Sequence, residues 1–184
     1  MLLSRLRTET RAAHDAIERA LDLTAPALTR SRYVWLLERF YGFYRPLEEA
    51  LCAAGMPGLD LSARRKAPLL AADLAVLGAD AARVPECAAL PPRASPDDVA
   101  GCVYVLEGAT LGGQVISRHL HEALALGPGS GARFFHGYGA ATGDMWQDVR
   151  TAIESFAARA CADDVVRAAA ATFATLQAWC EEAS

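Results

Sequence analysis

The sequence lacks the features that mark several large classes of protein. Its five cysteines are widely spaced and form no CxxC pair, which argues against both a disulfide framework and a zinc knuckle. Neither sign of charge is gathered into a block, and a net charge of −4 provides no broad positive field for nucleic acid. We therefore expect reduced thiols in the core and no binding of nucleic acid.

Long apolar runs are also scarce. Residues 1–11 carry charges every few positions, without the apolar stretch of a signal peptide. No segment is expected to reach the ~20 apolar residues that a membrane span requires. We therefore expect a soluble, cytoplasmic protein that does not bind a membrane.

The composition that is present is typical of packed helices. With 184 residues, 53% of them hydrophobic and 22% charged, the chain has the size and balance of one globular domain over residues 1–184. Alanine is abundant, which favours closely packed helices, and no strand pattern or internal repeat is visible. The sequence therefore predicts an all-α, single-domain, multihelical bundle.

Apolar residues recur every three or four positions through most of the chain, which predicts amphipathic helices separated by glycine and proline. Ser31 is a candidate N-cap of the second helix. Ser95, followed by proline and two aspartates, is typical of the start of the fourth. The expected helices span residues 3–21, 31–54, 62–77, 96–126 and 144 to the C-terminus, the last of them broken near 162–163.

A histidine on the first expected helix has charged neighbours at helical spacing. Arg7, Arg11 and Glu18 lie seven, three and four residues from His14, so on one helix they occupy neighbouring parts of its surface. A neutral imidazole can bind haem iron while a nearby carboxylate orients its other nitrogen, and arginines can pair with propionates. The alternative is a surface histidine beside an acid on a solvated helix, and spacing alone leaves both open.

The fourth expected helix contains three glycines, Gly108, Gly112 and Gly113. Each costs about 1 kcal/mol relative to alanine, so the helix needs a compensating reason, such as a bend or the close approach of a flat ligand. Gly108 and Gly112 share a stripe that we expect to face a ligand, whereas Gly113 lies on a more apolar stripe expected to face the core. Tight helix packing through small residues is the alternative.

Two segments together carry a family resemblance. They read Thr10-Arg-Ala-Ala-His-Asp-Ala-Ile-Glu18 and Leu106-Glu-Gly-Ala-Thr-Leu-Gly-Gly-Gln114. They resemble the bacterial haem oxygenase family, particularly members associated with bacterial phytochromes, and the resemblance extends to Trp146-Gln-Asp-Val-Arg150. It implies the family's all-helical fold, with haem held between the first and fourth helices.

The resemblance also implies roles for single residues. His14 becomes the proximal ligand of the haem iron, and Gly108 and Gly112 become distal glycines whose backbone leaves room for bound O2. Arg7 and Arg150 match basic positions near the propionates, and Glu18 matches the acid beside the proximal histidine. The candidate site residues are therefore His14, Arg7, Arg11, Glu18, Gly108, Gly112 and Arg150.

The implied activity is degradation of haem b, which is both cofactor and substrate. Oxygen activated at the iron attacks a meso carbon of the same porphyrin, and electrons come from an external donor protein or a small reductant. The products are biliverdin, carbon monoxide and ferrous iron, and the resemblance implies a bacterial phytochrome as the consumer of biliverdin.

One departure from the family affects proton delivery. Many members carry aspartate directly after the first distal glycine, where it helps to anchor the proton-delivering water, but this chain has Ala109. The stretch Val103-Tyr104-Val105 also lacks the basic residue often found there. Two alternatives to an oxygenase therefore remain: a haem or bilin carrier without turnover, and a helical interaction module without a cofactor.

Overall fold

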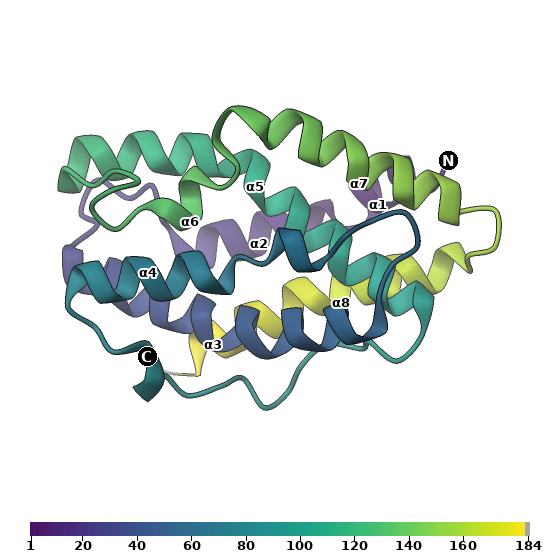
Figure 1. The fold of residues 1–184 in the computed structure, drawn as a ribbon, viewed down its shortest axis with the longest axis horizontal. Helices are drawn as coiled ribbons and strands as arrows, with labels where there is room; N and C mark the ends of the chain where they lie inside the picture. The colour runs from purple at the N-terminus through teal and green to yellow at the C-terminus, as the bar shows by residue number, and fades with distance from the viewer. Residues whose placement is uncertain (183–184) are drawn as a thin grey trace.

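The regular elements of the protein are helices, as Figure 1 shows for a computed structural model that describes residues 1–182. Within this range no strand forms, and an isolated bridge joins Met56 to Leu59. The all-α prediction is confirmed. The α-helices are α1 (Leu2–Glu9), α2 (Arg11–Leu21), α3 (Arg30–Ala54), α4 (Ala67–Leu77), α5 (Pro96–Leu124), α6 (Arg133–His136), α7 (Thr142–Phe156) and α8 (Ala162–Glu181), and the 3-10 helices are η1 (Ser62–Arg64), η2 (Ala81–Arg83) and η3 (Gly139–Ala141).

Helix α5 is the central element, because it packs against α3, α6, α7 and α8. Its start is fixed by the expected cap: the Ser95 hydroxyl accepts from Asp98 N–H, and the Asp98 carboxylate accepts from Ser95 N–H. By length and composition α5 could span a membrane, contrary to the expectation that no segment is apolar enough. Half of its most apolar stretch is buried inside the protein, and that burial accounts for its apolar character.

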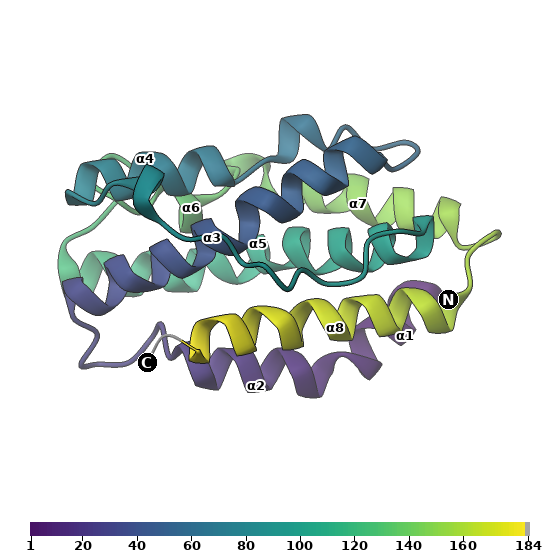
Figure 2. The same cartoon turned by 90° about the horizontal axis from the view of Figure 1, so that it is seen from below.

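Helix α8 supports both the N-terminal helices and α5. Figure 2 shows α2 running alongside α8, and α1, α2, α3 and α5 all pack against this helix. Helix α1 also contacts α7. The positions of α2 and α5 relative to each other are therefore set largely through α8.

The expected first helix is wrong in one respect, because it breaks at Thr10. This residue has φ −95° and ψ 0°, ends α1 and begins α2. Its hydroxyl donates to the Leu6 carbonyl oxygen at 2.7 Å, a local bond that competes with the regular helix ladder. Arg7 therefore lies on α1 and His14 on α2, and continuous helical spacing does not relate them.

Two other boundaries differ from expectation. Thr29, not Ser31, caps α3, since its hydroxyl accepts from Arg32 N–H at 3.2 Å. The expected helix over 62–77 is interrupted before α4, where the Glu48 carboxylate accepts from the backbone N–H groups of residues 66 and 67. A break in the last expected helix is found, but it lies at residues 157–161, and residues 162 and 163 begin α8.

All five cysteines are free thiols. Cys87, Cys102 and Cys180 are buried in the core, Cys52 is half-buried and Cys161 is exposed. The expectation of core thiols is therefore wrong for Cys161, which lies at the turn before α8.

Candidate functional site

His14 lies on α2 with a side chain that is 48% exposed. Its ring packs edge-on against the Phe173 ring of α8, with centroids 5.7 Å apart and planes at 84°. Its Nδ1 is 3.6 Å from a Glu18 oxygen and 3.7 Å from an Asp15 oxygen. Two carboxylates thus lie close to one ring nitrogen without forming a hydrogen bond to it, and Nε2 is left for a metal ligand bond.

The three candidate arginines come from three different helices. Arg11, on α2, lies 3.5 Å from the Asp15 carboxylate. Arg150, on α7, donates to the Gln147 side-chain oxygen at 3.1 Å. Arg7, near the end of α1, is exposed and makes no ion pair within residues 1–182. All three guanidinium groups are exposed, so each has freedom to turn toward an anionic group.

Helix α5 meets the N-terminal helices near both ends of its glycine segment. Burial raises the pKa of the Tyr104 hydroxyl, and the nearby Thr10 hydroxyl and Arg7 charge oppose that rise. Further along α5, His119 Nε2 lies 3.0 Å from the Ala25 carbonyl oxygen, just after α2. The two ends of segment 104–119 therefore lie near the N-terminal region, one beside the junction of α1 and α2 and the other beside the turn after α2.

The three glycines of α5 have three different surroundings. A Cβ at Gly113 collides with the Phe135 carbonyl oxygen, so this glycine allows α6 to approach α5 closely. A Cβ at Gly108 meets the Trp146 ring at 3.8 Å, an ordinary contact. A Cβ at Gly112 has no atom of residues 1–182 within 4 Å. Packing explains Gly113, as the alternative proposed, but it leaves the cost of Gly112 unexplained.

The surface around Gly112 is apolar and open. Leu111 and Val115 are 46% and 64% exposed, and they are among the few large apolar side chains that the fold leaves uncovered. Ala109, one turn before, is also exposed. An exposed apolar surface beside a glycine without a packing role suits a flat apolar ligand.

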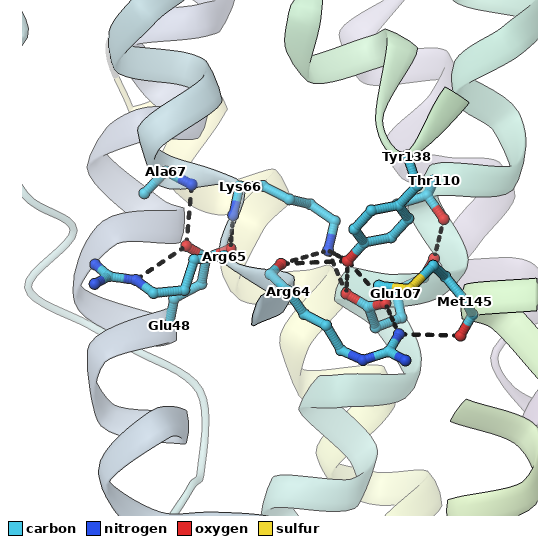
Figure 3. Close-up of polar contacts among 9 residues, drawn as sticks. All are labelled: Glu48, Arg64, Arg65, Lys66, Ala67, Glu107, Thr110, Tyr138 and Met145. Atoms are coloured by element: carbon cyan, nitrogen blue, oxygen red, sulfur yellow. Dashed lines mark hydrogen bonds and ion pairs between the residues drawn. The ribbon is translucent and has the colours of Figure 1, made fainter. Parts of the chain in front are cut away.

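A buried ionic cluster around Glu107, the residue before Gly108, was not predicted from the sequence (Figure 3). Glu107 is buried, and its carboxylate accepts from Arg64 Nη1 at 2.9 Å and from the Lys66 ammonium. Tyr138 donates to the same carboxylate at 3.0 Å. Burial and the Glu107 charge both raise the pKa of Tyr138, so its hydroxyl stays a donor. Glu107 is thus fully engaged and does not replace the aspartate absent at Ala109.

The signal that could have revealed the cluster is weak. Glu107 follows Val99 by eight residues and Val103 by four, so helical spacing places it on the buried side of α5. Its cationic partners come from a segment about forty positions earlier, and sequence periodicity carries no information on such pairings.

Comparison with known proteins identifies the family and the fold. The curated heme oxygenase of Xanthomonas campestris pv. campestris is 38% identical over 93 residues, 49% of this chain and 53% of that protein. The match thus spans about half the length of this curated relative. Three solved heme oxygenases share the fold, and that of Neisseria meningitidis matches with a TM-score of 0.83 and 19% identity over 99% of this chain and 91% of that one. The structure from Leptospira interrogans matches with a TM-score of 0.75 and 21% identity over 98% of each chain. The structure from the cyanobacterium Synechocystis, in complex with heme, matches with a TM-score of 0.72 and 21% identity over 98% of this chain and 91% of that one.

The fold is therefore that of the bacterial haem oxygenases. A profile of the family described as Heme oxygenase matches residues 1–182, nearly the whole chain. The protein belongs to the haem oxygenase family.

Proposed function

We propose that this protein degrades haem b with O2 and external electrons to biliverdin, carbon monoxide and ferrous iron. The proposal is carried by two features together: the half-exposed His14, with two carboxylates close to one ring nitrogen, and the open, apolar surface of α5 at Gly112. Haem, when bound, supplies the iron that activates O2 and the porphyrin that is cleaved. Membership of the family and the haem-bound Synechocystis relative support this choice of ligand.

The chain's own residues bind and orient the ligand. His14 Nε2 would bind the haem iron, with the Glu18 and Asp15 carboxylates close to Nδ1 and the Phe173 ring packed against the imidazole. Arg7, Arg11 and Arg150 pair with the propionates.

The distal side is formed by backbone. Gly108 and Gly112 present no side chain, which leaves room for O2 and for ordered water. Because Ala109 has no carboxylate and Glu107 is engaged elsewhere, we infer that the α5 backbone holds the water that delivers protons.

The experiment is titration of the purified protein with haem, followed by a reductant system and O2. We expect the Soret spectrum to give way to that of biliverdin. His14→Ala should lose the axial-ligand spectrum and turnover with the fold intact, whereas His121→Ala, an exposed histidine on α5, should behave as wild type. An unchanged axial spectrum in His14→Ala refutes the assignment of the ligand.

Ala109 favours a second candidate, a haem or bilin carrier that keeps the site without turnover. A stable oxygen complex that yields no biliverdin would establish the carrier and reject the enzyme. In that case Ala109→Asp should restore turnover, because a carboxylate there can anchor the proton-delivering water.

We further propose a cytoplasmic enzyme that takes electrons from a donor protein or a small reductant and passes biliverdin to a bacterial phytochrome. The support for this consumer is the resemblance of the two motifs to phytochrome-associated members. Chromatography of the product after one turnover, followed by its addition to an apo-phytochrome, tests the proposal, and absence of a covalent bilin adduct contradicts it.

A further inference from the structure

Arg39, on α3, is a buried charge without an anionic partner. Its exposed fraction is 8%, and within residues 1–182 no carboxylate forms an ion pair with it. The guanidinium stacks on the Trp179 ring of α8, with its Cζ 3.3 Å from the ring centroid, and its Nη2 donates to the Trp179 carbonyl oxygen. Its Nε is enclosed and has no hydrogen-bond partner in the described part of the chain.

These contacts leave the charge undercompensated. Burying a guanidinium is unfavourable unless it is paired, and one carbonyl oxygen and one ring face satisfy only part of its hydrogen-bonding capacity. Burial lowers the pKa of Arg39, and the neighbouring Cys180, Cys87 and Glu182 only partly offset this effect. Since an arginine side chain keeps its charge in proteins, an external anion is the simplest compensation.

A cavity gives such an anion access to the guanidinium. It has a volume of about 490 Å³, lies between α3 and the segment that contains η2, and includes Arg39 in its lining. This volume is within the range of small-molecule sites. Arg39 Nη1 has no hydrogen-bond partner in residues 1–182 and, unlike Nε, is not fully enclosed, so it remains accessible from the cavity.

The other charged groups of the lining are one further cation and two carboxylates. Arg83 is exposed and forms no ion pair with any described residue. Asp80 caps η2, because its carboxylate accepts from Ala82 N–H at 3.0 Å. Glu38 is the remaining carboxylate, and the Trp35 indole adds an apolar wall. Two cations thus stand against two carboxylates, and the Asp80 carboxylate is already engaged by a backbone N–H group.

We propose that this cavity binds a small ligand through a phosphate or carboxylate group, with Arg39 as the anchor and Arg83 as the second cation. The Nη1 group of Arg39 can donate charge-assisted hydrogen bonds to either kind of oxyanion. The site uses none of the residues assigned to haem, so it stands independently of the proposed function.

The test is calorimetric titration of the haem-free full chain with inorganic phosphate and, separately, with citrate, at constant ionic strength. We expect one of the two anions to bind saturably and to change the tryptophan fluorescence. Binding of phosphate assigns a phosphate group to the ligand, and binding of citrate assigns a carboxylate group. Arg39→Gln should weaken binding at least about tenfold, because it removes a charge-assisted hydrogen bond. Arg45→Gln, on the same helix but outside the cavity lining, should leave the affinity within about twofold.

Two results overturn the proposal. The first is no saturable binding of either anion at millimolar concentration. The second is binding that neither Arg39→Gln nor Arg83→Gln weakens. Should Arg39→Gln fail to fold, the exposed Arg83→Gln variant decides the question alone.

Discussion

Adjacent glycines in α5 have opposite relations to the rest of the protein. Gly113 is buried against the Phe135 backbone, whereas Gly112 is exposed with open space beside it. We predict that Gly113→Ala lowers the free energy of unfolding by about 1–3 kcal/mol through overpacking. Gly112→Ala should raise it by up to about 1 kcal/mol, because alanine favours helix. Chemical denaturation of the haem-free variants measures both, and equal effects of the two changes would contradict this assignment.

At this scale the sequence predicted the faces of α5 but not the partners of its charges. The helical period of 3.6 residues places Gly112 and Gly113 on different faces of α5, and this follows from the sequence alone. The buried pairing of Glu107 with Arg64 and Lys66 was not predicted, because it depends on how distant segments pack.

Among the elements, α4 and α6 are joined through one carboxylate. Asp73 of α4 accepts from the backbone N–H groups of Arg133 and Phe134, at 2.9 and 2.8 Å, where α6 begins. Burial raises the pKa of Asp73, and the two backbone hydrogen bonds only partly counter this. Burial therefore disfavours the charged carboxyl more than the two hydrogen bonds favour it, so folding favours the protonated form of Asp73.

This raised pKa predicts the sign of a pH effect. Between the unfolded value near 3.8 and the higher folded value, the folded state holds more protons, so stability falls as pH rises. The stability difference between wild type and Asp73→Asn should thus decrease as pH rises above about 4 and then become constant. Denaturation at several pH values measures it.

Asp60→Asn provides the control for that measurement. The Ser62 hydroxyl and the backbone N–H groups of residues 62 and 63 lower the pKa of Asp60. The stability difference between wild type and Asp60→Asn should therefore increase as pH rises toward 4. Slopes of the same sign for the two variants would show that the Asp73 assignment is wrong.

The helices themselves were largely predictable, and their breaks were not. Apolar period and the Ser95 cap predicted α5 nearly to its bounds. The break at Thr10 depends on a side-chain hydrogen bond, and the interruption before α4 depends on Glu48 from another helix. Neither cause lies in local periodicity, so continuous helices were expected at both places.

For the whole molecule, the Glu107 cluster connects segments far apart in the chain. Arg64 also donates to the Met145 carbonyl oxygen of α7 at 3.0 Å, and Lys66 precedes α4. We predict that Glu107→Gln lowers the free energy of unfolding by about 3–5 kcal/mol, because it leaves the buried Lys66 without its counter-charge and Arg64 with only the exposed Asp148 carboxylate. Equilibrium denaturation measures the loss.

Glu86→Gln is the matched control, since Glu86 pairs with Arg45 at the surface. The same substitution there should change stability by less than about 1 kcal/mol. A loss at Glu107 no larger than that at Glu86 would show that the cluster contributes little to the fold.

At this scale, composition and periodicity predicted an all-α bundle, and the motif resemblance implied where a ligand lies. Neither the sequence pattern nor the resemblance predicted that α8 packs against both α2 and α5. Many helix arrangements bury the same apolar stripes, and the choice among them depends on close packing of whole surfaces.

The uncovered side chains of Leu111 and Val115 have a consequence for the amount of protein in the cell. A ligand that covers them binds the folded chain and not the unfolded one, so it stabilises the fold by mass action. At a free ligand concentration about 100 times the dissociation constant, the gain is about 2.7 kcal/mol. Proteolysis draws on the unfolded fraction, so the level of this protein should rise and fall with the supply of its own substrate.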